Sequence, residues 1–350
     1  MARITRSSLT SVPTSFATCS LSPEVPLQRR LRAISAAGFT GIEVSFPDLL
    51  SHAQSLSPSR PISPTDYPNL LPACESIRSL CASLNLQIMM LQPFANFEGH
   101  PPDSPGRADA FARARGWISL MIALGTDLLQ VGSSDSPDIS PDTNLLAADL
   151  RELADMLAEH GFRLAYENWC WATRAPGWKQ VWEIVQLVGR DNVGLCLDTF
   201  QTAGGEWGDP TTESGVREDV DKSEVDKRWR ASLEELSGTV PSEKVYLLQI
   251  SDAYKPHPEP LSTGLGVDGL RPRGRWSHDY RGMIGKDGGY LPVREVLQAV
   301  LKTGFRGWLS VELFDGGEEG KEEREEDVEG YATECMRLIR KMLDDVAEGE

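Results

Sequence analysis

Four segments of the sequence place an oxygen-bearing side chain at or near the end of an apolar run. "RLAYE" ends in Glu167, "VGLCLD" ends in Asp198, "VYLLQI" contains Gln249, and "WLSVE" ends in Glu312. One aspartate in such a place is most simply a helix N-cap or a turn residue. Four side chains at equivalent places indicate instead that they belong to one shared site.

The chemistry of these four side chains is suited to a divalent cation. Carboxylates that lie close together raise each other's proton affinity unless a cation neutralises them. Carboxylate and amide oxygens are the ligands that hard divalent ions prefer in proteins. We therefore predict that Glu167, Asp198, Gln249 and Glu312 hold a divalent metal ion, with Mg²⁺, Mn²⁺ and Co²⁺ as the candidates.

A repeated pattern of helix, glycine turn and apolar run must position these side chains. "LADMLAEHGFRLAYEN" (153–168) and "REVLQAVLKTGFRGWLSVELF" (294–314) show it most clearly. Near-continuous apolar runs are typical of parallel strands covered on both faces. The expected strands are 16–21, 41–45, 87–92, 127–132, 163–167, 193–198, 244–250 and 308–313.

Eight alternating strands and helices predict an α/β fold of the (β/α)8 TIM barrel type. The ends of four neighbouring strands then meet at one side of the barrel mouth. The alternative is an open doubly wound sheet, but no GxGxxG motif follows its first strand.

The domain organisation that we expect is one barrel over residues 15–350, preceded by a disordered leader over 1–14. The leader is Arg- and Ser/Thr-containing without acids, which faintly resembles a transit peptide. A long loop over 253–292 is rich in Pro, Gly and basic residues, and we expect it to cover a substrate. An amphipathic helix over 331–346 is expected to complete the barrel wall.

Composition excludes several classes of partner. The formal net charge is -17 and the sequence pI is about 4.8, so nucleic-acid partners are not expected. No apolar stretch approaches the ~18 residues that a membrane span requires. Six cysteines without a CxxC pair favour a reduced, cytoplasmic compartment. A small-molecule substrate is the expected partner, and a homodimer is one assembly that the sequence allows.

The four metal-capable residues are similar to the metal site of xylose isomerase-like barrels, the sugar isomerase/epimerase superfamily. More closely, the chain resembles 3-dehydroshikimate dehydratases of fungal quinate catabolism and their bacterial relatives. The resemblance covers roughly residues 16–315 and is carried by "LQPFANFEG" (91–99), "YENWCW" (166–171), "LCLDTFQTAG" (195–204), "WSHDYR" (276–281), "GGYLPVREV" (288–296) and "GWLSVELF" (307–314).

The resemblance implies roles for individual residues. It implies that the four metal-capable residues are the ligands, and that Ser277 and Arg281 contact the substrate. Gln92, in the "QPF" motif, and Gln201 are further candidates for substrate contact.

The chain departs from the family at four places, one of which is the segment after Glu43, acidic or histidine-bearing in relatives and "VSFPDLL" here. Gln201 stands where bacterial members carry a histidine, His278 stands where many members have an arginine, and Ala95 stands where some relatives have an arginine. The general base therefore stays open between His278 and a carboxylate near the metal, because an amide such as Gln201 cannot serve.

The implied reaction is the dehydration of 3-dehydroshikimate to protocatechuate, as part of quinate metabolism. A base removes the proton α to the ketone, the β-hydroxyl leaves, and the dienone tautomerises to the aromatic product. A divalent ion would stabilise the enolate, and Arg281 would pair with the substrate carboxylate.

Three alternatives to the dehydratase remain at this point. The same barrel and ion could serve a sugar or keto-polyol isomerase or epimerase, which expels no hydroxyl. Metal-dependent endonuclease chemistry also occurs on such barrels, although the acidic charge argues against it. A catalytically silent barrel that binds a metabolite is the non-enzyme alternative.

Overall fold

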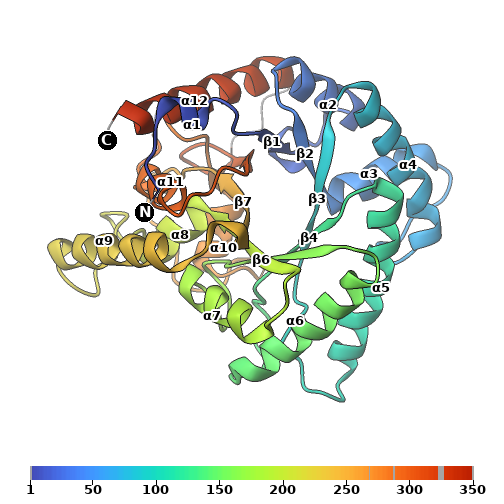
Figure 1. Cartoon of the computed structure of the whole chain (residues 1–350), viewed down its shortest axis with the longest axis horizontal. Coiled ribbons are helices and arrows are strands. Elements are labelled where there is room, and N and C mark those ends of the chain that lie inside the picture. The colour runs from blue at the N-terminus through green and yellow to red at the C-terminus, as the bar shows by residue number, and fades with distance from the viewer. Residues whose placement is uncertain (1, 268, 287, 322–326, 349–350) are drawn as a thin grey trace.

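The structure, a computed structural model that describes residues 2–267, 269–286, 288–321 and 327–348, is built around a closed barrel of eight parallel strands (Figure 1). The barrel strands follow one another in chain order and the last pairs with the first. They are β1 (Thr14–Ala17), β2 (Gly41–Ser45), β3 (Gln87–Phe94), β4 (Leu128–Gly132), β5 (Arg163–Glu167), β6 (Val193–Asp198), β7 (Val245–Ile250) and β9 (Trp308–Val311). The predicted (β/α)8 barrel is confirmed.

The helices form a ring outside the strands, as Figure 1 shows. The main helices of this ring are α2 (Leu27–Ala36), α3 (Phe46–Leu56), α4 (Tyr67–Ser83), α5 (Pro105–Leu124), α6 (Thr143–Ala158), α7 (Trp178–Val188), α8 (Thr199–Glu206), α9 (Lys222–Thr239), α11 (Val293–Lys302) and α12 (Val328–Glu348). Their apolar faces pack on the outward side chains of the strands in one continuous core. Burial of this apolar surface is the main force that holds the ring to the barrel.

The inside of the barrel holds a second, smaller apolar cluster. Met90, Leu128, Ala165, Cys196 and Leu247 point inward and pack together below the barrel mouth. Successive side chains of a strand point to opposite faces, so the next inward residue along each strand lies nearer the C-terminal end. The inner cluster therefore forms the floor beneath the strand-end residues.

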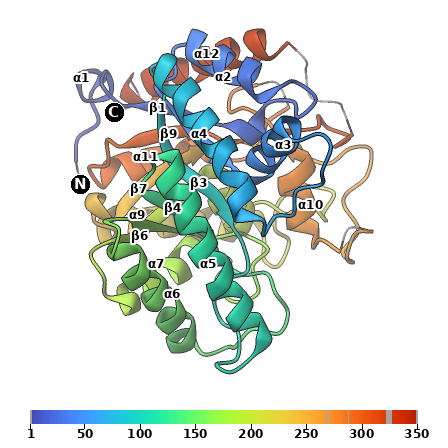
Figure 2. The ribbon, with the colours of Figure 1, turned by 90° about the vertical axis from the view of Figure 1, so that its right-hand side faces the viewer.

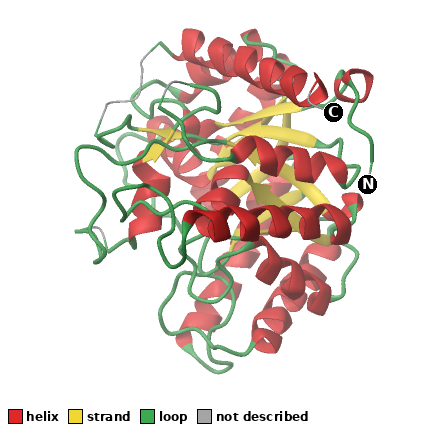
Figure 3. Cartoon of the chain, turned by 90° about the vertical axis from the view of Figure 1, so that its left-hand side faces the viewer, coloured by secondary structure: helices red, strands yellow, loops and turns green. Residues whose placement is uncertain are grey.

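The two ends of the barrel differ in what covers them. The loop that joins β7 to β9 carries α10 (Pro272–Asp279) and β8 (Tyr280–Arg281), which pairs antiparallel with β10 (Phe314–Asp315). Figure 2 shows α10 at one end of the barrel and α1 (Arg6–Leu9) at the other. Figure 3, from the opposite side, shows long loops gathered at the same end as the short two-stranded sheet. The expected irregular loop thus contains ordered structure.

The segment expected to be a disordered leader is ordered where the structure describes it. Thr5 and Ser8 form a reciprocal capping box at the start of α1. Ile4 and Leu9 are buried, and α1 packs against α12. The backbone N–H of Ala2 also donates to the carbonyl of Lys302 at 2.8 Å. Two buried apolar side chains, the contact with α12 and this backbone hydrogen bond hold the segment to the barrel.

Two further boundaries differ from the predicted ones. The first strand ends at Ala17, because the rest of the apolar run expected over 16–21 turns into the 3-10 helix η1 (Thr18–Ser20). The C-terminal helix begins before the predicted 331–346 and buries Cys335, Met336 and Ile339, as its periodicity predicted. Within the described residues, none of the helices has both the length and the apolar character needed to cross a bilayer.

Candidate active site

Three carboxylates meet at the C-terminal end of the barrel. Glu167 ends β5, Asp198 ends β6, and Glu312 directly follows β9. Each offers an oxygen, and these oxygens all lie within 4.8 Å of one another. All three side chains are buried, and Gln249 near the end of β7 pairs in register with Asp198. The structure thus brings the four predicted ligands to one end of the barrel.

Arg281 from β8 lies against this cluster. Its Nη1 lies 3.0 Å from Oε2 of Glu312, and its Nη2 forms an ion pair with Oδ2 of Asp198. The guanidinium is 1% exposed and also donates to Oγ of Ser251 and of Ser277. A buried positive charge between two carboxylates compensates part of their negative charge.

Burial and mutual repulsion shift the titration of the three carboxylates. Burial, followed by the charges of Glu312 and Asp198, raises the pKa of Glu167 well above its ordinary value. Burial also raises the pKa of Asp198 and of Glu312, and Arg281 offsets part of each increase. Although burial alone would lower it, these carboxylates raise the pKa of Arg281. The three carboxylates therefore carry more negative charge than one arginine neutralises, and a further cation would stabilise the cluster.

Two further polar residues of this centre escaped the sequence analysis. Glu43 on β2 accepts a hydrogen bond from Nε2 of Gln249 at 2.9 Å, and Gln130 on β4 donates to Glu167. Both side chains are buried, and burial first of all raises the pKa of Glu43 to about 8. The signal in the sequence was a polar residue at an inward position of the apolar runs "GIEVS" and "LLQVG".

Unpaired oxygens show that the cluster suits a cation. Among the described residues, Oε1 of Glu167 and of Gln130 are buried and accept no hydrogen bond. Buried polar atoms are almost always paired, with a protein group, a water or an ion. Two unpaired acceptors within a cluster of carboxylates are what a hard divalent ion and its bound water would satisfy.

Protonation of this centre predicts how the metal-free protein responds to pH. Its carboxylates have raised pKa values in the folded state, so the folded protein binds more protons than the unfolded chain. Stability of the metal-free protein should therefore fall as pH rises from about 4.5 to about 8, the interval set by Glu43. Chemical denaturation at several pH values, with a chelator and then with Mn²⁺, tests this. Metal-free stability that rises across the interval would contradict it.

A pocket of about 570 Å³ opens directly above the carboxylates. Its lining includes Glu167, Glu312, Arg281 and every residue expected to contact the substrate, namely Gln92, Gln201, Ser277 and His278. Trp169, Trp171 and Phe314 supply aromatic walls. A mostly apolar cavity with a few convergent polar groups is typical of a small-molecule site.

The expected substrate residues make different contacts within the protein. Nε2 of Gln92 donates to Glu312 at 2.9 Å, whereas Oε1 of Gln201 accepts from the backbone N–H of Cys170 at 2.9 Å. Oγ of Ser277 accepts from Arg281. The exposed His278 stacks on Phe314 with ring centroids 5.9 Å apart. Gln92 and Gln201 thus also hold parts of the site in place.

The tryptophans divide into pocket and core residues. Trp169 stacks on Trp171 with ring centroids 5.1 Å apart, and its Nε1 donates to Glu167 at 3.3 Å. A Cβ at Gly132 would lie 2.2 Å from the Trp169 ring, so this glycine lets the indole lie beside the strand end. Trp276 is buried against Phe200 and belongs to the core.

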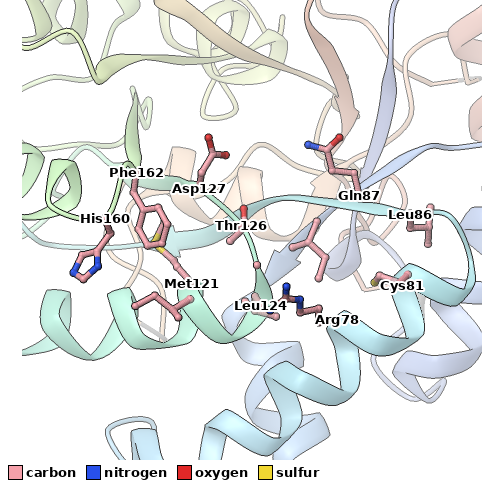
Figure 4. A pocket seen from close by; sticks show the side chains of 14 residues that line it. Arg78, Cys81, Leu86, Gln87, Met121, Leu124, Thr126, Asp127, His160 and Phe162 are labelled. Carbon is pink, nitrogen blue, oxygen red and sulfur yellow. The ribbon is translucent and has the colours of Figure 1, made fainter.

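A larger pocket of about 850 Å³ lies at the opposite end of the barrel (Figure 4). Its lining comes from the segments that precede β3, β4 and β5, and Figure 4 shows Arg78, Asp127 and His160 there among apolar side chains. It contains none of the predicted site residues. Active sites of such barrels lie at the C-terminal ends of the strands. The smaller pocket lies at that end and contains the carboxylates, so it is the candidate active site although the other pocket is larger.

Comparison with known sequences identifies similar proteins. Residues 31–340 match the family described as xylose isomerase-like TIM barrel. The chain is 35% identical over 328 residues to a protein of Neurospora crassa named 3-dehydroshikimate dehydratase, with 90% of this chain and 89% of that protein covered. It is 34% identical to a protein of Pseudomonas aeruginosa with the same name, covering 87% of this chain but only 38% of that protein.

Solved structures agree with the fold. A xylose isomerase-like TIM barrel/4-hydroxyphenylpyruvate dioxygenase fusion protein superposes with a TM-score of 0.71 at 27% identity, over 96% of this chain and 43% of that one. The IOLI protein, solved with a zinc atom, superposes with a TM-score of 0.64 at 18% identity, over 96% of this chain and 98% of that one. This chain thus covers less than half of the fusion protein and nearly the whole of the IOLI protein.

Proposed function

This chain belongs to the xylose isomerase-like TIM barrel family, and from that premise we propose that it converts 3-dehydroshikimate to protocatechuate and water. The observation that carries the proposal is the position of the carboxylate cluster. Glu167 and Glu312 lie in the same pocket as Ser277, His278 and Arg281, where metal and substrate residues must meet. The relatives that carry this activity in their names support the choice of substrate.

The residues proposed to hold the ion are Glu167, Asp198, Gln249 and Glu312. When bound, a divalent ion supplies Lewis-acid stabilisation of the negative charge that develops on the ketone oxygen of the substrate. The donor set contains oxygen only, which suits Mg²⁺, Mn²⁺ or Co²⁺. Gln92 and Gln130 donate to Glu312 and Glu167, and so orient carboxylates of the site.

The pocket also holds candidate groups for binding the substrate carboxylate, for removing the α-proton and for excluding water. Arg281 lines the pocket, and its guanidinium would pair with the substrate carboxylate in place of its 3.4 Å hydrogen bond to Ser277. His278 is the candidate that takes the α-proton, because an imidazole exchanges protons near neutral pH. Trp169, Trp171 and Phe314 exclude water from the ring of the substrate.

Turnover measured by ultraviolet absorbance of protocatechuate tests the proposal. The protein is stripped of metal with a chelator, incubated with 3-dehydroshikimate, and then supplied with Mg²⁺, Mn²⁺ or Co²⁺. We expect no product before the ion is added and restored turnover afterwards, because the developing enolate charge is otherwise unstabilised.

Two results would contradict the proposed function. Wild-type protein that binds the ion but forms no aromatic product is not this dehydratase. Product formed at an undiminished rate in the presence of the chelator would show that the carboxylates do not act through a metal. Interconversion of a keto-polyol without loss of water would favour an isomerase.

A further inference from the structure

We propose that Glu43 is a positioning residue that fixes the side-chain amide of Gln249 so that its oxygen, and not its nitrogen, faces the metal. The inference deepens the proposed function and rests on its metal site, although it does not depend on the identity of the substrate. Glu43 lies on β2, outside the four ligands, and does not line the pocket.

The contact between Glu43 and Gln249 crosses the inside of the barrel. Two strands, β1 and β9, lie between β2 and β7 in the strand order. Oε2 of Glu43 nevertheless accepts from Nε2 of Gln249 at 2.9 Å, between two side chains that are both fully buried. A hydrogen bond in such a dry interior is strong, and a lost partner there is costly.

The opposite side of the amide has its own partner. Oε1 of Gln249 lies 3.4 Å from Sγ of Cys196, whose S–H donates to it. Cys196 stands two residues before Asp198 on β6. The amide oxygen therefore points toward the strand that carries Asp198, and the amide nitrogen points away toward β2. In this orientation the oxygen of Gln249, which has the lone pairs, lies on the side of β6, and the NH₂ group lies on the side of β2.

Rotation of the amide by 180° would reverse this arrangement. The oxygen of Gln249 would then face Oε2 of Glu43, and the buried hydrogen bond from Nε2 of Gln249 would be lost. The amide nitrogen would face the centre, and an amide NH₂ has no lone pair for a cation. By accepting from Nε2 of Gln249, Glu43 thus favours the orientation that presents the oxygen, in the way that outer hydrogen bonds orient metal ligands.

Two substitutions of Glu43 distinguish its effect on the orientation of the Gln249 amide from the effect of its own charge. In Glu43→Gln the new amide can accept from Gln249 or donate to it, so both orientations of Gln249 become stable. In Glu43→Leu the acceptor is gone. Glu98→Gln is the matched control, because Glu98 is also a buried carboxylate with one unpaired oxygen but bonds only Ser134 and Tyr166.

Binding of Mn²⁺ to the metal-stripped proteins, without substrate, is measured by electron paramagnetic resonance of the free ion. We expect about 10- to 100-fold weaker binding for Glu43→Leu, an intermediate loss for Glu43→Gln and no change for Glu98→Gln. Visible absorption of bound Co²⁺ should change in both Glu43 variants, which reports a changed ligand set, and should stay unchanged in Glu98→Gln.

Wild-type affinity for Mn²⁺ in Glu43→Gln and Glu43→Leu would overturn the inference. If Glu43→Leu does not fold, Glu43→Gln alone decides, since its size is that of the native side chain. Absence of Mn²⁺ binding in the wild type overturns the inference as well. Wild-type protein that binds Mn²⁺ as expected but forms no protocatechuate contradicts the proposed reaction and leaves the role of Glu43 standing.

Discussion

Asp198→Asn is expected to lower the turnover of 3-dehydroshikimate by about 10³-fold, the equivalent of ~4 kcal/mol of lost charge stabilisation. Asp198 has two tasks that this variant separates. Its Oδ1 caps α8 by accepting from the backbone N–H of Phe200 at 2.6 Å and of Gln201 at 3.0 Å. Its Oδ2 faces Arg281. Asparagine keeps an oxygen for the cap and loses the charge.

Comparison with alanine completes this experiment. Asp198→Ala removes the cap as well and should cost a further ~1 kcal/mol of folding stability. Asp142→Asn is the control, because Asp142 caps α6 by accepting from Asn144 and is not one of the clustered carboxylates. Steady-state turnover with saturating Mn²⁺ and thermal unfolding are measured for all three variants. Turnover of Asp198→Ala within tenfold of wild type would exclude Asp198 as a metal ligand.

Arg281→Met is expected to destabilise the metal-free protein by about 3–5 kcal/mol. The substitution leaves Asp198 and Glu312 buried without their positive partner, next to Glu167. A divalent ion at the same carboxylates would replace much of the missing positive charge. With saturating Mn²⁺ the loss of stability should therefore be much smaller, while turnover should stay abolished because Arg281 is also proposed to bind the substrate carboxylate.

Denaturant unfolding with a chelator and with Mn²⁺ measures this difference. Arg30→Met is the matched control, because Arg30 forms a buried ion pair with Asp48 at 2.9 Å outside the carboxylate cluster. Its effect on the unfolding free energy should not depend on Mn²⁺. A loss of stability in Arg281→Met that is equal with and without the ion would show that Arg281 and the metal do not compensate the same charges.

The barrel was predictable because its signals are local. The predicted strands at 41–45, 163–167 and 193–198 match β2, β5 and β6, since each is a short apolar run bounded by glycine or polar residues. The first strand was misplaced because an apolar run does not distinguish a strand from the 3-10 turn that follows Ala17. The order of α1 was missed because its stability comes from contact with α12.

The sequence by itself determined the barrel and the convergence of Glu167, Asp198, Gln249 and Glu312, because parallel strands that close into a barrel present their C-terminal ends together. Only the tertiary structure decided which side chains pair with these four residues. Gln249 meets Glu43 across 206 residues of sequence, and Asp198 meets Arg281 across 83. The first pair depends on which inward side chains of the barrel strands meet, and the second on how the segment between β7 and β9 folds over the barrel mouth. Periodicity along a single strand carries no information about either.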